Sequence, residues 1–207
     1  IRKIGNVSGF GGTIPHKIAI IPLFDAVTDA AQEIGAVNFV RREESGRLVG
    51  DNLDGPGFIE GLRSNGIEPK GMSVLMLGAG GAGRAVGFGL AKAGARSLWI
   101  ANRDIAKAAA LATDIQFAYP DCSLHSGPDH GNHFDLIVNT TSLGMDEQDE
   151  LPLDLTEISS DTIISDIIVN PPMTRWLELA QAKGCRIING VPMLDSQMVL
   201  ACKHMGI

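Results

Sequence analysis

The chain has 207 residues, and its 24 acidic side chains against 17 basic ones give a formal net charge of −7. This acidic balance argues against nucleic-acid binding, which uses a basic surface. Hydrophobic residues make up 44% of the chain and charged residues 20%, values that allow a buried core and argue against disorder. No apolar run is long enough to cross a membrane, so we expect no membrane partner.

The three cysteines, Cys122, Cys185 and Cys202, have no paired spacing, which argues against a disulfide scaffold. They favour a reducing compartment, and we expect the protein to be cytoplasmic. The first residues lack the apolar segment of a signal peptide and also lack an initiator methionine. We therefore expect further residues upstream of the visible start.

The first 70 residues suggest two strands, at 35–41 and 47–50, separated by the turn-prone Glu44-Ser45-Gly46. A segment of this size is too small to form a stable domain alone. We predict that residues 1–52 belong to an N-terminal α/β substrate-binding lobe that is incomplete in this chain. Upstream residues, or a C-terminal segment at 193–207 with a helix from Met193 to His204, would complete it.

From Met72 onward, short apolar runs alternate with helical patterns, which is typical of βαβ units and a parallel sheet. Strands are predicted at 73–77, 97–101, 115–118, 134–139, 162–168 and 186–188. Helices are predicted at 82–93, 104–113 and 174–183. The fold class is therefore α/β, and residues 53–190 are predicted to form a Rossmann-type domain that binds a dinucleotide.

A glycine-rich turn, Gly78-Ala79-Gly80-Gly81-Ala82-Gly83, follows the first strand of this region and precedes its first helix. It fits the dinucleotide fingerprint G-x-G-x-x-G in the structural context that this fingerprint requires. Gly78 would permit the tight turn, Gly80 would let the backbone approach a pyrophosphate, and Gly83 would let helix pack on strand. Because the helix N-terminus would face the anion, the predicted cofactor-binding residues are Gly78, Gly80, Gly81, Ala82 and Gly83.

The end of the second strand of this region bears on the choice of cofactor. NAD sites usually carry an acidic residue there, which binds the ribose 2′-hydroxyl. Here Asn102 is neutral, Arg103 offers a planar fork that suits a 2′-phosphate, and Lys107 adds charge one helical turn later. NADP is therefore favoured. Asp104 would repel that phosphate unless it caps the next helix and points away, so NAD stays open.

A lysine and an aspartate in the first part of the chain form a candidate catalytic pair. Lys17 follows a glycine-rich, proline-containing loop, and Asp54 lies in the turn-prone segment 50–55. In carbonyl reduction, an ammonium can donate a proton as hydride makes an alkoxide, while a carboxylate orients the substrate.

The chain resembles the shikimate dehydrogenase family, including its quinate/shikimate dehydrogenase relatives. The matching pieces run nearly from end to end: TIPHK at 13–17, IGAVN at 34–38, GDNLDG at 50–55, the glycine turn, NR at 102–103, NTTSLG at 139–144 and GVPMLDSQ at 190–197. The resemblance implies reversible, NADPH-dependent reduction of 3-dehydroshikimate, a step of aromatic amino acid biosynthesis, between a substrate lobe and a dinucleotide lobe. The partner would be a small cyclic hydroxycarboxylate, and the protein would be a monomer or a homodimer.

The resemblance also implies roles for individual residues. Lys17 and Asp54 would form the catalytic pair, and the substrate hydroxyls would be held by Thr13, Asn38 and Gln197. The cofactor site would further include Asn139, Thr140, Gly190 and Met193, the last of them beside the nicotinamide.

Departures from the family pattern leave the substrate open. The chain has Gly11-Gly12 where the family usually has Asn-Val, Leu53 where it has threonine, and Val169 where it places a tyrosine near the substrate carboxylate. Loss of a hydroxyl that meets a charged carboxylate costs about 1.5 to 3 kcal/mol, so we expect shikimate itself to be a poorer substrate than in the family, and a close analogue stays open as the substrate. Two alternatives remain: an NAD-dependent quinate dehydrogenase with Asp104 on the ribose, and a ligand-binding regulator without turnover.

The sequence does not match the motifs of metal-dependent dehydrogenases or of short-chain dehydrogenases. The set Cys122, His125, His130 and His133 matches no zinc spacing, so no metal site is predicted. The only tyrosine, Tyr119, is followed four residues later by Ser123, which excludes the Tyr-x-x-x-Lys proton donor of short-chain dehydrogenases.

Overall fold

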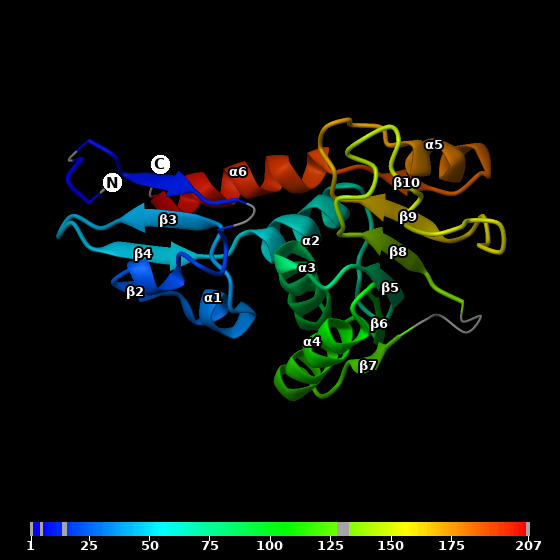
Figure 1. Ribbon diagram of the computed structural model, residues 1–207, viewed down its shortest axis with the longest axis horizontal. Helices are drawn as coiled ribbons and strands as arrows, with labels where there is room; N and C mark the ends of the chain where they lie inside the picture. Colours follow the sequence, from blue (N-terminus) through cyan, green and yellow to red (C-terminus); the bar gives the residue numbers. More distant parts are fainter. Residues whose placement is uncertain (1, 5, 14–15, 128–132, 206–207) are drawn as a thin grey trace.

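The computed structural model describes residues 2–4, 6–13, 16–127 and 133–205, which form two lobes joined by helices (Figure 1). The first lobe holds a four-stranded sheet of order β1-β3-β4-β2, and the second holds a six-stranded sheet of order β10-β9-β8-β5-β6-β7. Motif residues Ile14 and Pro15, and Gly206 and Ile207 of the predicted C-terminal segment, lie outside the described residues.

The first sheet is mixed. Strand β3 (Phe39–Arg42) pairs antiparallel with β1 (Gly9–Gly11) and β4 (Leu48–Asp51), and β2 (Ala26–Val27) pairs parallel with β4. The predicted strands at 35–41 and 47–50 are thus confirmed as β3 and β4, except that β3 begins four residues later than predicted. The reason is the helix α1 (Asp29–Ile34), which ends at Gly35 in a left-handed conformation with φ +70°.

The second sheet is parallel throughout its described strands, which confirms the predicted α/β class. The strands are β5 (Ser73–Leu77), β6 (Ser97–Ala101), β7 (Ser123–Ser126), β8 (Leu136–Asn139), β9 (Ile163–Asp166) and β10 (Ile187–Ile188). Alternate β5 side chains serve opposite faces: Val74 and Met76 join one buried cluster, and Leu75 and Leu77 join the other. Helices α3 (Gly81–Lys92) and α4 (Ile105–Ala118) contribute to the first cluster, and α5 (Arg175–Ala182) contributes to the second.

One predicted strand of this sheet is wrong. Residues 115–118 form the last turn of α4, and the strand beside β6 is β7. Ile115 extends a buried helical stripe that also contains Ala108, Leu111 and Ala112, a spacing of three and four residues. The apolar character of this short stretch therefore reflects a helix face.

Two helices connect the lobes. The predicted C-terminal helix is confirmed as α6 (Val191–Met205), which runs from the six-stranded sheet back along the first lobe (Figure 1). Beside it lies α2 (Asp54–Ser64), where the sequence predicted only a turn. A Cβ atom built on Gly55 would lie 2.5 Å from the Ala85 carbonyl oxygen of α3, and one on Gly61 would lie 2.8 Å from the Met193 nitrogen. Glycine therefore lets α2 pack closely against both α3 and α6.

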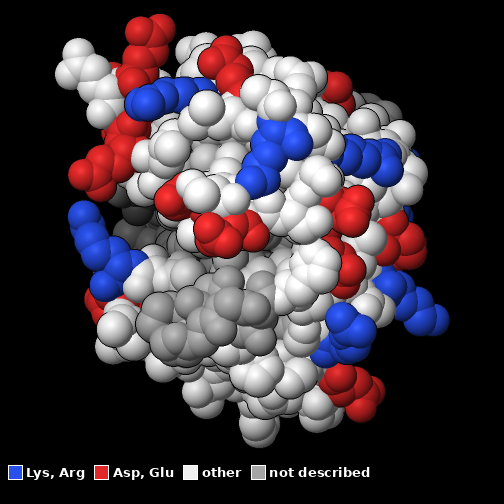
Figure 2. All heavy atoms as spheres, turned by 90° about the vertical axis from the view of Figure 1, so that its right-hand side faces the viewer, with Lys and Arg blue, Asp and Glu red and all other residues white. Residues whose placement is uncertain are grey.

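Two further features of the described residues are the distribution of charge over one face and the apolarity of the helices. On the face shown in Figure 2, lysine and arginine side chains are scattered among aspartate and glutamate side chains. Among the residues that the structure describes, no helix combines the length and the apolarity needed to traverse a bilayer.

Candidate active site

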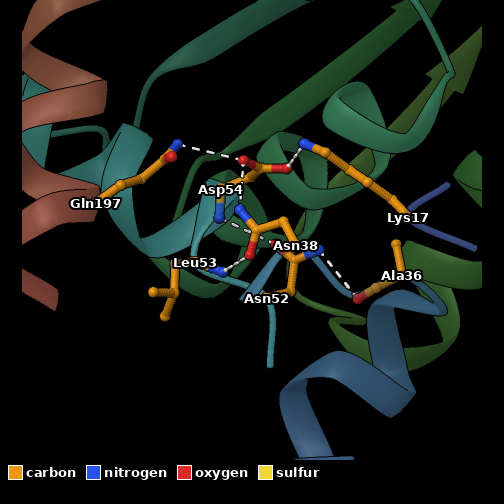
Figure 3. A network of polar contacts seen from close by, with 7 residues as sticks. All are labelled: Lys17, Ala36, Asn38, Asn52, Leu53, Asp54 and Gln197. Atoms are coloured by element: carbon orange, nitrogen blue, oxygen red, sulfur yellow. Dashed lines mark hydrogen bonds and ion pairs between the residues drawn. The ribbon is translucent and has the colours of Figure 1, made fainter. Parts of the chain in front are cut away.

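The Asp54 carboxylate is the point at which side chains from four separate parts of the chain meet (Figure 3). Its Oδ1 accepts hydrogen bonds from Asn38 Nδ2 at 2.7 Å and from Gln197 Nε2 at 3.2 Å. Its Oδ2 forms an ion pair with Lys17 Nζ. The structure thus brings together four of the five residues predicted to act on the substrate.

Thr13, the fifth of these residues, is exposed and is not among the described partners of Asp54. It lies on the segment that leads to Lys17, and backbone hydrogen bonds tie this segment to the two residues before β3. Gly12 N donates to Asn38 O at 2.7 Å, and Val37 N donates to Lys17 O at 2.7 Å. The departure at Gly11-Gly12 therefore leaves the attachment of this segment in place.

The turn before α2 is held by a residue that the sequence analysis missed. Asn52 is 1% exposed; its Nδ2 donates to Ala36 O at 3.1 Å, and its Oδ1 accepts from Asp54 N at 3.0 Å. An asparagine two residues before a helix start is a signal for such local bonding, but it is common in turns that have no site. Asn52 sets the position from which the Asp54 side chain enters the site.

Leu53 supports the same turn through its backbone. Its N–H donates to Asn38 Oδ1 at 2.7 Å, while its side chain points away from the Asp54 carboxylate (Figure 3). The departure at this position therefore removes no partner of Asp54.

The Lys17–Asp54 pair is largely withdrawn from water, with side chains 13% and 5% exposed. A buried ion pair is favourable only when its geometry is good and its remaining polar atoms are also satisfied. Asn38 and Gln197 provide those further bonds to Asp54. The Lys17 side chain keeps a small contact with solvent.

Lys17 also lies against the glycine turn of the other lobe. A Cβ atom built on Gly81, the first residue of α3, would be 3.9 Å from Lys17 Cδ. The candidate catalytic pair therefore lies next to the candidate cofactor turn.

The glycine turn needs glycine at two of its positions. Gly78 has φ +108°, and a Cβ on Gly83 would collide with the Gly78 carbonyl oxygen, so each needs glycine for a different reason. Gly80 precedes α3 without a side-chain cap, and a Cβ built there would meet no described atom within 4 Å. Helix α3 therefore begins without a side chain that caps its first amides, and there is open space beside Gly80, as expected of an anion site at a helix N-terminus.

Of the polar residues after β6, Asn102 and Asp104 make hydrogen bonds to the backbone, and Arg103 is exposed. Asn102 Oδ1 accepts from Ala79 N at 3.1 Å, so this side chain ties the strand end to the glycine turn. Asp104 caps α4, with its Oδ1 accepting from Lys107 N at 3.2 Å and its Oδ2 lying 3.7 Å from Lys107 Nζ. Arg103 is exposed. Asp104 thus takes the capping position rather than lying free beside a ribose.

Asn139 and Thr140 shape the loop after β8. Asn139 is fully buried and donates to Leu143 O at 3.0 Å, while Thr140 Oγ1 donates to Leu77 O at 2.8 Å. A Cβ built on Gly78 would lie 2.8 Å from Thr140 Oγ1, so this loop packs directly on the glycine turn.

Gly190 and Met193 lie at the start of α6. A Cβ on Gly190 would be 2.5 Å from the Ile167 carbonyl oxygen, which requires glycine there. Met193 is 8% exposed and joins the cluster that contains Phe58 and Leu62 of α2. These two residues pack α6 against its neighbours.

Two of the four residues considered for a metal, Cys122 and His125, have other surroundings in the structure. Burial raises the pKa of the Cys122 thiol to about 11, and the His125 ring stacks on Trp99 with centroids 4.7 Å apart. His130 lies outside the described residues. Within the described ranges, no group of three His, Cys, Asp or Glu side chains is arranged to hold a metal ion.

Comparison with known proteins identifies two families along the chain. Residues 1–40 match the family described as "Shikimate dehydrogenase substrate binding domain", and residues 63–146 match "Shikimate / quinate 5-dehydrogenase". A protein of Geobacillus sp. (strain WCH70) named shikimate dehydrogenase (NADP(+)) is 40% identical over 205 residues, covering 97% of this chain and 73% of that protein.

Solved structures of similar proteins share the fold. The structure of shikimate 5-dehydrogenase from Thermus thermophilus with NADP(H) and shikimate has a TM-score of 0.88 and 38% identity, covering 100% of this chain and 75% of that one. The ligand-free 5-ketofructose reductase of Gluconobacter sp. strain CHM43 has a TM-score of 0.86 and 36% identity, covering 96% of this chain and 73% of that one.

Proposed function

Because this chain belongs to the shikimate dehydrogenase family, we propose that it is an NADP-dependent oxidoreductase that interconverts 3-dehydroshikimate and shikimate. The observation that carries the proposal is the convergence of Lys17, Asn38 and Gln197 on Asp54 beside the first turn of α3. A lysine and a carboxylate next to a phosphate-binding turn are the groups that carbonyl reduction needs.

Lys17 is the proposed acid and base. During reduction its ammonium donates a proton to the carbonyl oxygen as the carbonyl carbon gains hydride, and during oxidation its amine takes the proton from the hydroxyl. NADPH, when bound, supplies the hydride and leaves as NADP⁺. The partial exposure of Lys17 lets the proton return from solvent after each turnover.

Asp54 and Gln197 are proposed to orient the substrate hydroxyls. A carboxylate has about four acceptor positions, and the described partners of Asp54 fill three of them. The remaining position can accept a hydrogen bond from a substrate hydroxyl. Gln197 uses its amide N–H on Asp54, which leaves its carbonyl oxygen to accept from another hydroxyl.

The proposed cofactor contacts come from the turn at Gly78–Gly83 and the segment after β6. The free amides at the start of α3 would bind the diphosphate, and Arg103 with Lys107 would bind the 2′-phosphate. The capping of α4 by Asp104 supports NADP over NAD, because the capping bond holds this carboxylate on the helix N-terminus.

We also propose the domain boundaries and the oligomeric state that the sequence analysis predicted. They are a substrate-binding lobe at 1–52 completed by 193–207, a dinucleotide domain at 53–190, and a monomer or homodimer. A cytoplasmic location is supported by the free thiols of Cys122, Cys185 and Cys202.

The proposal is tested by measuring initial rates of oxidation of shikimate, quinate and fructose. Each substrate is measured with NADP⁺ and with NAD⁺, and the oxidation of fructose would give 5-ketofructose. We expect the highest kcat/KM with shikimate and NADP⁺. A preference for quinate with NAD⁺ would favour the quinate dehydrogenase alternative. Tight ligand binding without turnover on any of the three would favour the regulator and refute the proposed reaction.

A further inference from the structure

Asp166 is a buried carboxylate at the end of β9. It is 1% exposed, and none of the described lysine or arginine side chains forms an ion pair with it. Its Oδ1 accepts from Ile168 N at 3.0 Å and from Asn139 Nδ2 at 3.2 Å, and its Oδ2 accepts from Thr174 Oγ1 at 3.0 Å. A buried carboxylate without a cation is costly, and here all of its compensation comes from these three donors.

The first of its connections leads to the cofactor turn. Asn139 bridges Asp166 and the loop after β8, because its Nδ2 also donates to Leu143 O and its Oδ1 accepts from Thr141 N and Thr141 Oγ1. Thr140, inside that loop, packs against Gly78 and Gly83 of the glycine turn. The orientation of the Asn139 amide therefore fixes the wall behind the turn.

The second connection leads to the substrate side. Ile168, held by Asp166 through its N–H, accepts from Gly190 N at 3.2 Å through its carbonyl oxygen. Gly190 has no room for a side chain there and leads directly into α6. Helix α6 then carries Gln197 to the Asp54 carboxylate.

We propose that Asp166 is a positioning residue that fixes two segments of the active site: the loop beside the cofactor turn, through Asn139, and the start of α6, through Ile168. This inference rests on the proposed function, because it concerns the same site. Asp166 does not touch the reacting groups; it fixes the two segments between which they must meet.

The chemistry of the three donors predicts how substitutions behave. Asparagine at 166 can keep its carbonyl oxygen on Ile168 N and Asn139 Nδ2 and turn its amide toward Thr174 Oγ1, which can accept as well as donate. Alanine would leave two buried N–H groups and a hydroxyl without their partner. The conservative variant should therefore rescue what the alanine variant loses.

The test compares Asp166→Ala and Asp166→Asn with the matched control Thr162→Val, which removes a buried 3.0 Å hydrogen bond to Phe134 O beside the other end of β9. For each variant we would measure the dissociation constant of NADP⁺ and the kcat and KM for shikimate. We would also measure hydrogen exchange of the Thr141 and Leu143 amides in the absence of ligand. We expect Asp166→Ala to weaken NADP⁺ binding and raise the KM for shikimate by about tenfold or more and to speed amide exchange. Asp166→Asn should stay within about threefold of the wild type, and Thr162→Val should lose stability without these changes.

Equal losses in Asp166→Ala and Thr162→Val, or no loss in Asp166→Ala, would overturn the inference. If Asp166→Ala does not fold, Thr174→Val and Thr174→Ser replace it. The inference is supported if Thr174→Val binds NADP⁺ more weakly than the wild type and Thr174→Ser binds it as the wild type does. Unchanged NADP⁺ binding in Thr174→Val overturns the inference. A wild type that binds NADP⁺ but turns over no substrate refutes the proposed function alone, since the binding and exchange comparisons still decide the role of Asp166.

Discussion

Gln197 in α6 donates a hydrogen bond of 3.2 Å to Asp54 in α2, 143 positions earlier in the chain. This bond joins a helix that starts at the edge of the six-stranded sheet to the first residue of the helix that follows the other sheet. The site is therefore built where the two lobes meet, and each lobe supplies groups that the other lacks.

Replacing Gln197 with alanine removes one donor to Asp54 and one candidate acceptor for the substrate. Because hydrogen bonds to charged groups contribute about 1.5 to 3 kcal/mol, we expect kcat/KM for shikimate to fall by about 10- to 100-fold. NADP⁺ affinity should change little. Steady-state kinetics check this, with Met198→Ala as control, since Met198 is 59% exposed on the same helix. Equal effects in both variants would contradict the role of Gln197.

The Asn52→Ala variant tests the turn that positions Asp54. It leaves Ala36 O and Asp54 N without their partner in a buried place, so the free energy of unfolding should fall by about 1 to 3 kcal/mol. Urea denaturation measures this, with exposed Gln148→Ala as the control. Stability unchanged from the wild type would show that Asn52 does not hold the turn.

Arg103→Ala tests the preference for the phosphorylated cofactor. Loss of a charge-assisted hydrogen bond should lower kcat/KM with NADP⁺ by about 10- to 100-fold and leave kcat/KM with NAD⁺ nearly unchanged. Arg47→Ala, in the exposed turn between β3 and β4, is the matched arginine control. An Arg103→Ala enzyme that kept its NADP⁺ preference would remove the 2′-phosphate argument.

Because of Asp166, the free energy of unfolding of the protein should depend on pH. Burial raises the pKa of this carboxyl above its usual 3.8, so the folded state binds the proton more tightly than the unfolded state does. The resulting stability is fully present below pH 3.8 and is lost as the pH rises through the raised pKa.

Asp166→Asn is neutral at every pH and should escape this loss. Its free energy of unfolding should therefore rise relative to that of the wild type as the pH increases toward neutrality. Urea titrations over a pH series measure the difference, with exposed Asp161→Asn as the control. A difference that does not change with pH would contradict the pKa direction.

The sequence predicts the first two strands of the parallel sheet well. Strands β5 and β6 have the predicted bounds, because their apolar runs differ clearly from the flanking turns, although β5 is buried along most of its length and β6 only at alternate residues. The error at 115–118 arises because a short apolar run is compatible with a strand as well as with the end of a helix. Only the spacing from Ala108 to Ile115 separates the two.

Helix α2 could not be predicted from local propensity. Its Gly55, Gly57 and Gly61 disfavour a helix in isolation, and the gain that offsets them is close packing on α3 and α6. The candidate site shows the same limit. The resemblance to a family pointed to Lys17, Asn38, Asp54 and Gln197, but their convergence depends on tertiary structure that no spacing along the chain reveals.

The most direct test of the catalytic proposal is the turnover of Lys17→Ala measured beside its NADP⁺ affinity. Loss of the proton donor should lower kcat for shikimate oxidation by about 10² to 10⁴. The dissociation constant for NADP⁺ should stay within about threefold of the wild type, since the proposed binding site of the diphosphate is the α3 amides and not Lys17. Turnover equal to that of the wild type would contradict the assignment of Lys17 as the acid and base.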